Sequence, residues 1–172
     1  MKILAISGSL RKASLNSAIL RVVQQLAAQD IEVRLYEGLG DLPLFNPDIV
    51  DEPPGVAQLR EQINAADVVL IASPEYAHGV TGAMKNALDW MVGNESFVYK
   101  PVVLLNTSPR ASHAQAALHE TLKTMSARML DEASISLPIL GSGLDEAQMH
   151  SEPFVRDAIN DMLNIVKQQI TT

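Results

Sequence analysis

Short apolar runs alternate with amphipathic segments along the whole chain, and this alternation most constrains the fold. Apolar runs predict four strands and a weaker fifth, at residues 3–7, 32–36, 68–72, 102–106 and 133–137. Most are continuously apolar, as expected of a parallel sheet that is covered on both faces. Apolar residues at helical spacing predict helices at 16–28, 81–91, 113–129 and 154–169, with a fainter one at 53–65. Strands that alternate with helices imply an α/β fold with an open, doubly wound parallel sheet.

The chain has the length and composition of one domain with a sizeable core. It has 172 residues, of which 47% are hydrophobic, and it contains no internal repeat or convincing linker. We therefore expect residues 1–172 to form a single domain with one site. The proline-rich stretch LPLFNPDIVDEPPG, residues 42–55, reads as a loop. Because it follows the second strand, it should lie at the same sheet edge as the loop after the first.

Composition excludes several classes of function. A net charge of −7 argues against a general nucleic-acid binder, which needs a basic face. No apolar stretch reaches the ~20 residues of a membrane span, so we expect no membrane partner. The absence of cysteine excludes disulfides and thiolate chemistry and suits the reducing cytoplasm, where we expect the protein. The four histidines show no metal-binding spacing, so no metal is expected.

Ligands of open α/β sheets bind beyond the carboxyl ends of the strands, so the loops there are the candidate sites. The first, GSLRKASLN at 8–16, offers hydroxyls and two cations before a helix, whose N-terminus favours an anion. It matches neither the Walker A nor the G-x-G-x-x-G pattern. Spacing alone leaves open whether this loop binds a phosphate or whether Ser14 or Asn16 merely caps the helix. Either Arg11 or Lys12 can face a phosphate, and we favour Arg11 for its bidentate geometry.

The second candidate loop, SPEYAHGVTGAMKNALDW at 73–90, places Glu75 and Tyr76 after a strand and two glycines before a helix. Gly79 and Gly82 would let the backbone approach a flat ligand, and Tyr76 could lie along its face. The alternative is an ordinary turn with a surface tyrosine, because glycine and proline punctuate turns generally.

The third candidate loop, NTSPRASHAQ at 106–115, again places hydroxyls and a charge after a strand. In the simplest interpretation Ser112 caps the next helix and Arg110 is solvated. His78 and His113 could line an acceptor pocket, or they could be two loop histidines in water.

Together these segments resemble the NADPH-dependent FMN reductase family of flavodoxin-like quinone, chromate and azo-dye reductases. GSLRKASLN, LPLFNPD at 42–48 and SPEYAHGVTGAMKNALDW occur in the family's order, each after the expected strand. The resemblance implies a flavodoxin-like three-layer sandwich, with a five-stranded parallel sheet in the order 2-1-3-4-5 and helices on both faces. Two positions depart from the family pattern: Ala77 stands where many members have Asn, and PRASH at 109–113 replaces a glycine-rich stretch.

The resemblance also implies non-covalently bound FMN and assigns residues to it. The residues that would surround the FMN phosphate are Ser9, Arg11, Ser14, Asn16 and Ser17. Those that would lie beside the flavin ring, largely through backbone groups, are Pro74, Glu75, Tyr76, Ala77, His78, Gly79 and, from the next loop, Ser108. Glu75 could instead be structural, with its carboxylate bound to a neighbouring loop or subunit. No protein residue is expected to be catalytic in itself, because the flavin carries the chemistry.

By the same resemblance the protein is a reductase. NADPH or NADH would give hydride to flavin N5, and a quinone-like small molecule or free FMN would then take the electrons. A flavodoxin-like electron-transfer module without its own substrate is the alternative, and a hydrolase using the same crevice is a third class. The family also implies a homodimer or homotetramer. Trp90 fits such an interface, since it lies on a different side of its helix from Met84, Leu88 and Met91.

Overall fold

The sheet has the parallel, doubly wound topology that the alternating pattern predicts. In the computed structural model, which describes residues 1–171, its strand order is β2-β1-β3-β6-β7, with β8 also paired to β6. All of these pairs are parallel. The strands are β1 (Lys2–Ser7), β2 (Glu32–Tyr36), β3 (Val68–Ala72), β6 (Pro101–Asn106), β7 (Arg128–Met129) and β8 (Ile135–Ser136). The flavodoxin-like order 2-1-3-4-5 is thus confirmed.

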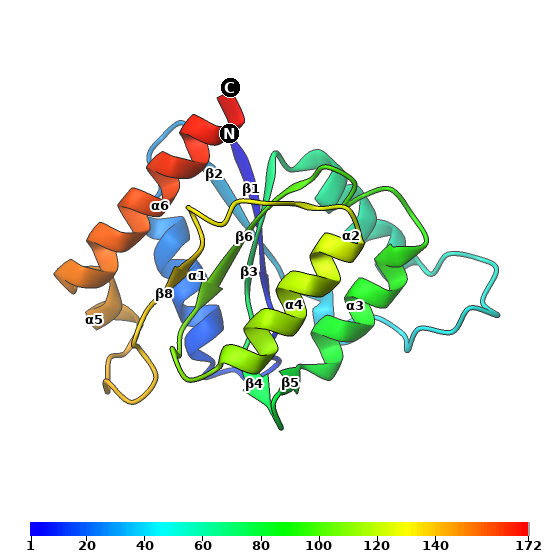
Figure 1. Cartoon of the computed structure of the whole chain (residues 1–172), viewed down its shortest axis with the longest axis horizontal. Coiled ribbons are helices and arrows are strands. Elements are labelled where there is room, and N and C mark those ends of the chain that lie inside the picture. Colours follow the sequence, from blue (N-terminus) through cyan, green and yellow to red (C-terminus); the bar gives the residue numbers. More distant parts are fainter. Residues whose placement is uncertain (172) are drawn as a thin grey trace.

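Helices cover both faces of the sheet. One face carries α1 (Leu15–Leu26), α5 (Glu146–Ser151) and α6 (Pro153–Thr171), and the other carries α2 (Pro54–Ala65), α3 (Gly82–Val92) and α4 (Ser112–Thr124) (Figure 1). A 3-10 turn, η1 (Gly38–Asp41), and a small antiparallel hairpin of β4 (Glu75–Tyr76) and β5 (Gly79–Val80) complete the fold.

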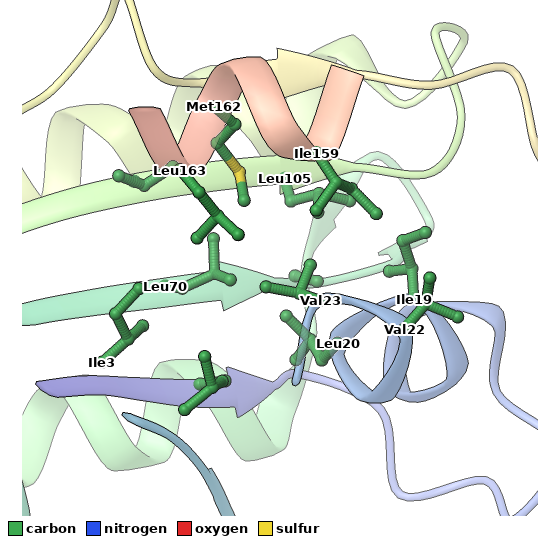
Figure 2. Packing of buried hydrophobic residues seen from close by; sticks show 14 of the residues in the cluster. Ile3, Ile19, Leu20, Val22, Val23, Leu70, Leu105, Ile159, Met162 and Leu163 are labelled. Carbon is green, nitrogen blue, oxygen red and sulfur yellow. The ribbon is translucent and has the colours of Figure 1, made fainter. Parts of the chain in front are cut away.

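Each face of the sheet has its own apolar core. On the α1 and α6 face, Val23 from α1 and Ile159 and Met162 from α6 meet strand side chains such as Leu70 and Leu105 (Figure 2). On the other face, Met84, Leu88 and Met91 of α3 are buried, as their spacing predicts. Every residue of β3 is buried, because helices cover that strand on both sides.

The fifth strand is the least regular part of the predicted sheet. β8 lies within the predicted range 133–137 but is only two residues long, and β7 pairs with the other half of β6. Between the two pairings, the hydroxyl of Ser134 accepts a hydrogen bond from the Leu104 N–H at 3.0 Å. A side chain therefore replaces the missing backbone partner at the gap in the strand.

Several predicted helix limits were wrong. α4 ends at Thr124 instead of at 129, because Ser126 adopts a left-handed φ of 62°. The N–H groups of Ser126 and Ala127 then donate to Lys123 and Leu122, which forms a Schellman motif. The predicted range 113–129 followed apolar residues that still contact the core after the helix has ended, Met125 and Met129 among them. α1 likewise ends at Leu26, two residues before the predicted end.

Trp90 packs within the chain, contrary to the orientation that suggested a subunit interface. Its indole Nε1–H donates to the Pro43 carbonyl at 2.7 Å, and its ring meets Phe45 edge-on at 5.1 Å between centroids. Asn86 of α3 also binds this loop, accepting from the Phe45 N–H and donating to the Pro43 carbonyl. The proline-rich loop is therefore docked on α3.

Gly8 is required by the close approach of the first loop to the end of β3. A Cβ at Gly8 would lie 2.6 Å from the Ser73 Cβ and 3.1 Å from its Cα, too close for the backbones to keep their positions. The Gly8 N–H donates to the Ala72 carbonyl at 2.8 Å, and the Gly8 carbonyl accepts from the Thr81 hydroxyl at 2.7 Å. These two bonds hold the first loop against β3 and the start of α3.

We expect Gly8→Ala to lower the free energy of unfolding by about 1–3 kcal/mol, since the added methyl overpacks this contact. Gly82→Ala is the matched control: a Cβ there meets nothing within 4 Å, and Gly82 begins a helix. That variant should be neutral or more stable by about 0.5–1 kcal/mol. Urea denaturation of both variants measures the difference, and equal stability of the two would contradict the steric argument.

Candidate functional site

The three predicted loops meet at the carboxyl edge of the sheet, which is the lower edge in Figure 1. They enclose a cavity of about 370 Å³, which we call the main cavity. Its lining residues come from the loops after β1, β3, β6 and β8: Ser9, Arg11, Ala13, Ser14, Leu15, Asn16, Pro74, Glu75, Tyr76, Asn106, Thr107, Ser108, Arg110, Ala111 and Leu140. The main cavity therefore occupies the crevice where open α/β sheets bind ligands.

Most of the predicted site residues line this cavity, and some do not. From the first loop, Ser9, Arg11, Ser14 and Asn16 line it, whereas Ser17 lines a neighbouring cavity and its hydroxyl is 2.8 Å from that of Ser7. From the other loops Pro74, Glu75, Tyr76 and Ser108 line it. Ala77, His78 and Gly79 occupy the turn and the returning strand of the β4–β5 hairpin, outside the cavity lining.

Ser14 caps α1, so the capping interpretation of the first loop holds for this residue. Its hydroxyl accepts from the Ser17 N–H at 3.3 Å, while its backbone is extended as an N-cap requires. Because a hydroxyl can accept one hydrogen bond and donate another, capping leaves Ser14 able to donate to an anion in the cavity. The N-terminus of α1 also directs its partial positive charge toward the same space.

The cavity rim carries positive charge without protein counter-ions. Within residues 1–171, the side chains of Arg11, Lys12 and Arg110 form no hydrogen bond or ion pair. Arg11 and Arg110 line the main cavity, whereas Lys12 faces only its neighbour on the β2 side. In a chain of net charge −7, uncompensated guanidinium groups beside a helix N-terminus suit a bound anion.

Buried side chains connect the loops to one another. The Thr107 hydroxyl donates to the Asn16 side-chain oxygen at 3.2 Å, and both residues are buried. Asn106 accepts from the Ser108 N–H at 2.9 Å and so orders the turn that follows β6. The Thr107 carbonyl in turn accepts from the Leu140 N–H at 2.9 Å, which holds the last loop against the third.

Glu75 ties the β4–β5 hairpin to the start of α4. Its Oε2 accepts from the Ala114 N–H at 2.9 Å, and its Oε1 lies 3.0 Å from His78 Nδ1. The His78 ring also meets that of His113 edge-on, with 4.6 Å between centroids. The hydrogen bond from Ala114 lowers the pKa of Glu75 below its ordinary value of 4.5, and His78 and His113 lower it further. Glu75 thus has a structural role, which the sequence offered as the alternative to flavin binding, but its carboxylate binds the first turn of α4 and not a loop.

The simplest interpretation of the third loop, with Ser112 as the N-cap of the next helix, was wrong. Ser112 is the first residue of the helix, and the N-cap position is held by Ala111, which has no side chain able to cap. Glu75 supplies the missing acceptor from a different loop, and its negative charge suits the helix N-terminus.

The hairpin turn is built from residues that favour other conformations. Ala77 and His78 both have positive φ, 50° and 61°, as the two central residues of a type I′ turn require. The glycines singled out from the sequence, Gly79 and Gly82, do not adopt positive φ, and no protein atom crowds either closely. At Ala77, where the family often has Asn, the structure therefore holds a strained alanine.

The sequence did not single out Leu140 and Arg110 as site residues. Leu140 lies in the loop after β8, which ends at the same sheet edge, so the crevice rule could have found it. Arg110 was interpreted as a solvated side chain, but it lines the main cavity.

Other features of the described chain bear on the class of site. A cavity of similar volume lies at the amino-terminal edge of β1 and β2, where such sheets do not bind ligands.

Among residues 1–171, no group of three or more His, Asp or Glu side chains could hold a metal ion. None of the helices in that range has both the length and the apolar character of a membrane span.

Comparison with known proteins places this geometry among flavin reductases. A family model for NADPH-dependent FMN reductases matches residues 1–138. An NAD(P)H-dependent FMN reductase of Pseudomonas aeruginosa is 32% identical over 97% of this chain and 94% of that protein. A quinone reductase of Escherichia coli K12 is 35% identical over 63% of this chain and 60% of that protein. The solved flavoenzyme NAD(P)H:(acceptor) oxidoreductase of Paracoccus denitrificans superposes with a TM-score of 0.79 at 30% identity, covering 97% of each chain.

Stability should depend on pH through Glu75. Because the pKa of Glu75 is lowered on folding, its contribution to stability is present above its ordinary value of 4.5 and is lost as the pH falls through the lowered pKa. Gln at this position cannot ionise, so Glu75→Gln should lose less stability than the wild type between pH 5 and pH 3, as measured by urea midpoints.

The matched control is Glu61→Gln, which changes an exposed carboxylate on α2. This variant should keep the pH dependence of the wild type. Parallel pH profiles for Glu75→Gln and the wild type would show that Glu75 does not stabilise the start of α4.

Proposed function

The chain belongs to the NADPH-dependent FMN reductase family, and we propose that it passes electrons from NAD(P)H through FMN to quinones. FMN-dependent reduction by NAD(P)H is the activity of this family, so the protein is an oxidoreductase that uses FMN, with NAD(P)H as co-substrate. We also propose that residues 1–172 act as one FMN-binding domain, and that the protein works in the cytoplasm, which suits its lack of cysteine.

One observation carries the assignment of the site. The main cavity joins the hydroxyl-rich loop after β1, with its uncompensated arginine, to the hairpin loop after β3. FMN has a phosphate at one end and a flat ring at the other, and the cavity is lined both by the anion-binding groups of the first loop and by the backbone and Tyr76 of the hairpin loop. Its volume of about 370 Å³ falls within the range of about 300–1,000 Å³ that is usual for small-molecule sites.

The phosphate would be held at the first loop. Arg11 would supply charge-assisted hydrogen bonds, and Ser9 and Ser14 would supply hydroxyl donors beside the N-terminus of α1. Asn16 lines the same space while its side-chain oxygen is held by Thr107, which fixes its orientation. Ser17 would support the loop through its contact with Ser7 instead of facing the main cavity.

The ring would lie beside the hairpin loop, with Pro74, Glu75 and Tyr76 on one side and Ser108 on another. Bound FMN supplies the redox chemistry, accepting hydride from NAD(P)H and passing electrons on. The protein's part would be to position and polarise the ring: the backbone N–H groups of Glu75 and Tyr76, which line the main cavity, would favour negative charge at the ring edge, as in an oxyanion hole. Glu75 keeps that backbone in place through Ala114, and Tyr76, which is 52% exposed, can cover the ring.

Relatives support a quinone-like acceptor. Quinone reductases of Escherichia coli and Pseudomonas putida are each 35% identical to this chain over the aligned segment. The matched segments span 60% and 66% of those proteins, so the acceptor is proposed on the shared region alone. Membership of a reductase family favours an enzyme over an electron-transfer module without its own substrate.

We propose in addition that the protein forms a homodimer or homotetramer. Support comes from large apolar side chains that the single chain leaves exposed on the docked proline-rich loop, where Leu44 is 83% and Val50 94% exposed. The loop extends beyond α3 at the right of Figure 1. Apolar side chains gathered on a loop that is itself anchored by Trp90 suit a protein–protein contact.

The function is tested by removing the proposed phosphate ligand. Arg11→Ala should raise the Kd of FMN about tenfold, the usual effect of losing a hydrogen bond to a charged group. Flavin fluorescence titration measures the Kd, and NADPH oxidation with FMN and a benzoquinone measures turnover. Wild-type turnover should exceed the free-flavin background, and the variant should need about tenfold more FMN to reach it.

Lys12→Ala is the matched control, because it removes the neighbouring cation, which does not line the main cavity. Its FMN affinity should stay within about twofold of the wild type. Wild-type turnover at the free-flavin background would overturn the reductase proposal, and equal effects of the two variants would overturn the role of Arg11.

The assembly is tested by light scattering. The wild type should give a mass at or above twice the 18.6 kDa of one chain. Val50→Lys, which adds a charge to an exposed loop position, should shift the mass toward one chain, whereas Glu120→Lys on α4 should not. A wild-type mass near 18.6 kDa at working concentration would refute the oligomer.

A further inference from the structure

The third loop carries Arg110 on a turn whose backbone is held at both ends. The Ala111 N–H donates to the Ser108 carbonyl at 2.9 Å, which closes a β-turn with Pro109 and Arg110 as its central residues. The side chain of Asn106 binds both ends of this turn, accepting from the Ser108 N–H at 2.9 Å and donating to the Ala111 carbonyl at 3.5 Å. Proline also fixes φ at the first central position, so the turn presents Arg110 from a rigid backbone.

The end of this loop is attached to the hairpin that would lie beside the flavin ring. Glu75 accepts from the Ala114 N–H, and the rings of His78 and His113 meet edge-on at 4.6 Å between centroids. In the sheet, β3, which precedes the hairpin, lies between β1 and β6. Because adjacent strands are about 4.8 Å apart, the strand before the third loop is roughly 10 Å from the strand that leads to Arg11. The third loop therefore belongs to the ring side of the proposed site.

The positive charge of Arg110 has no counter-ion in the site. Its guanidinium lines the main cavity and forms no hydrogen bond or ion pair within residues 1–171. Glu75 is the one acidic residue in the lining of that cavity, and its two oxygens already contact the Ala114 N–H and His78 Nδ1. Arg110 also belongs to PRASH, residues 109–113, where the chain departs from the family pattern. Its charge is therefore free for a ligand and is not one that the family resemblance predicts.

We propose that Arg110 binds an anionic group on the electron acceptor, so that the enzyme favours quinones with a carboxylate or sulfonate over neutral quinones. The proposal rests on the function proposed above, because it takes the flavin ring to lie beside the hairpin. An acceptor stacked on that ring has its substituents at the ring edge, within reach of a long guanidinium side chain. A guanidinium donates two parallel, charge-assisted hydrogen bonds to such a group. The overall reaction is unchanged: NAD(P)H supplies a hydride and solvent a proton, and the quinone becomes a hydroquinone.

Two other anions would enter the same site, the FMN phosphate and the phosphates of NAD(P)H. The FMN phosphate is assigned above to the first loop, at Arg11 and the start of α1. The pyrophosphate of NAD(P)H is separated from the nicotinamide by a ribose, whereas a substituent of a quinone lies on the reacting ring itself. The attachment of the third loop to the hairpin therefore favours the acceptor as the partner of Arg110, and the test below distinguishes the other two anions.

1,4-Naphthoquinone and its 2-sulfonate are matched acceptors, because they differ by one charged group. The quantity measured is the ratio of kcat/KM for the sulfonate to kcat/KM for the neutral quinone, from NADPH oxidation by the FMN-loaded protein above the free-flavin background. Arg110→Gln should lower this ratio about tenfold, the usual effect of losing a hydrogen bond to a charged group. Because the ratio is compared between variants, the different reduction potentials of the two quinones cancel.

Two further variants separate the charge of Arg110 from its contribution to the loop. Arg110→Lys keeps the charge, so its ratio should stay within about threefold of the wild type. Lys123→Gln removes the same charge from an exposed position on α4, and its ratio should stay within about twofold. Added salt should lower the ratio more for the wild type than for Arg110→Gln, because salt screens the pair of opposite charges.

A ratio that Arg110→Gln leaves unchanged would overturn the proposal. An unchanged ratio with a raised Kd for FMN would assign Arg110 to the FMN phosphate instead. An unchanged ratio with a raised KM for NADPH would assign it to the reductant.

A binding measurement separates this proposal from the function on which it rests. Naphthalene-2-sulfonate has no quinone to reduce, and its Kd, measured by calorimetry with saturating FMN, should rise about tenfold in Arg110→Gln and stay within about twofold in Lys123→Gln. That result in a protein whose turnover does not exceed the free-flavin background would support the anion site and refute the reductase. Turnover well above that background, with the ratio and the Kd unchanged in Arg110→Gln, would support the reductase and refute the anion site.

Discussion

The burial of the central strands on both faces is the constraint on which the rest of the structure depends. Every residue of β3 is buried, and so are the four apolar residues of β1, so helices must cross over on both sides. Parallel crossovers bring the ends of β1, β3, β6 and β8 to one edge. Hydrogen bonds from Thr81 to Gly8 and from Thr107 to Asn16 then join the loops at that edge. The packing of the core therefore determines the position of the crevice, and the loop residues determine its lining.

Where local chemistry and the apolar pattern agreed, the fold could be predicted from the sequence. The continuous apolar runs located the four main strands, and hydroxyl residues began α1 and α3 as caps, Ser14 and Thr81. The end of α4 could not be predicted from the sequence. A left-handed residue after a helix is usually Gly or Asn, but here that residue is Ser126. Met129 extended the predicted helix for a second reason: it lies in β7, after the helix has ended, but falls at the apolar spacing of the helix.

The site was partly predictable for a similar reason. Residues that line the crevice through their own loop, such as Ser9 and Arg11, carry a local signal of hydroxyls and charge before a helix. The role of Glu75 as the cap of α4 depends on a contact 39 residues away in the chain, which no local pattern reports. The sequence offered a turn in this loop as an alternative, but not its type I′ geometry at Ala77 and His78, because alanine is atypical of the positive φ that it adopts there.

The shared carboxylate of Glu75 makes the hairpin and α4 one cooperative unit. The first turn of a helix without its own cap frays when the group that accepts its N–H hydrogen bond moves away. Displacement of the hairpin, which carries Glu75, therefore opens the first turn of α4. The hydrogen bond of the Ala114 N–H therefore depends on the position of the hairpin beside the crevice. Its rate of hydrogen exchange reports whether the hairpin is seated, even though α4 carries no residue predicted to touch the flavin.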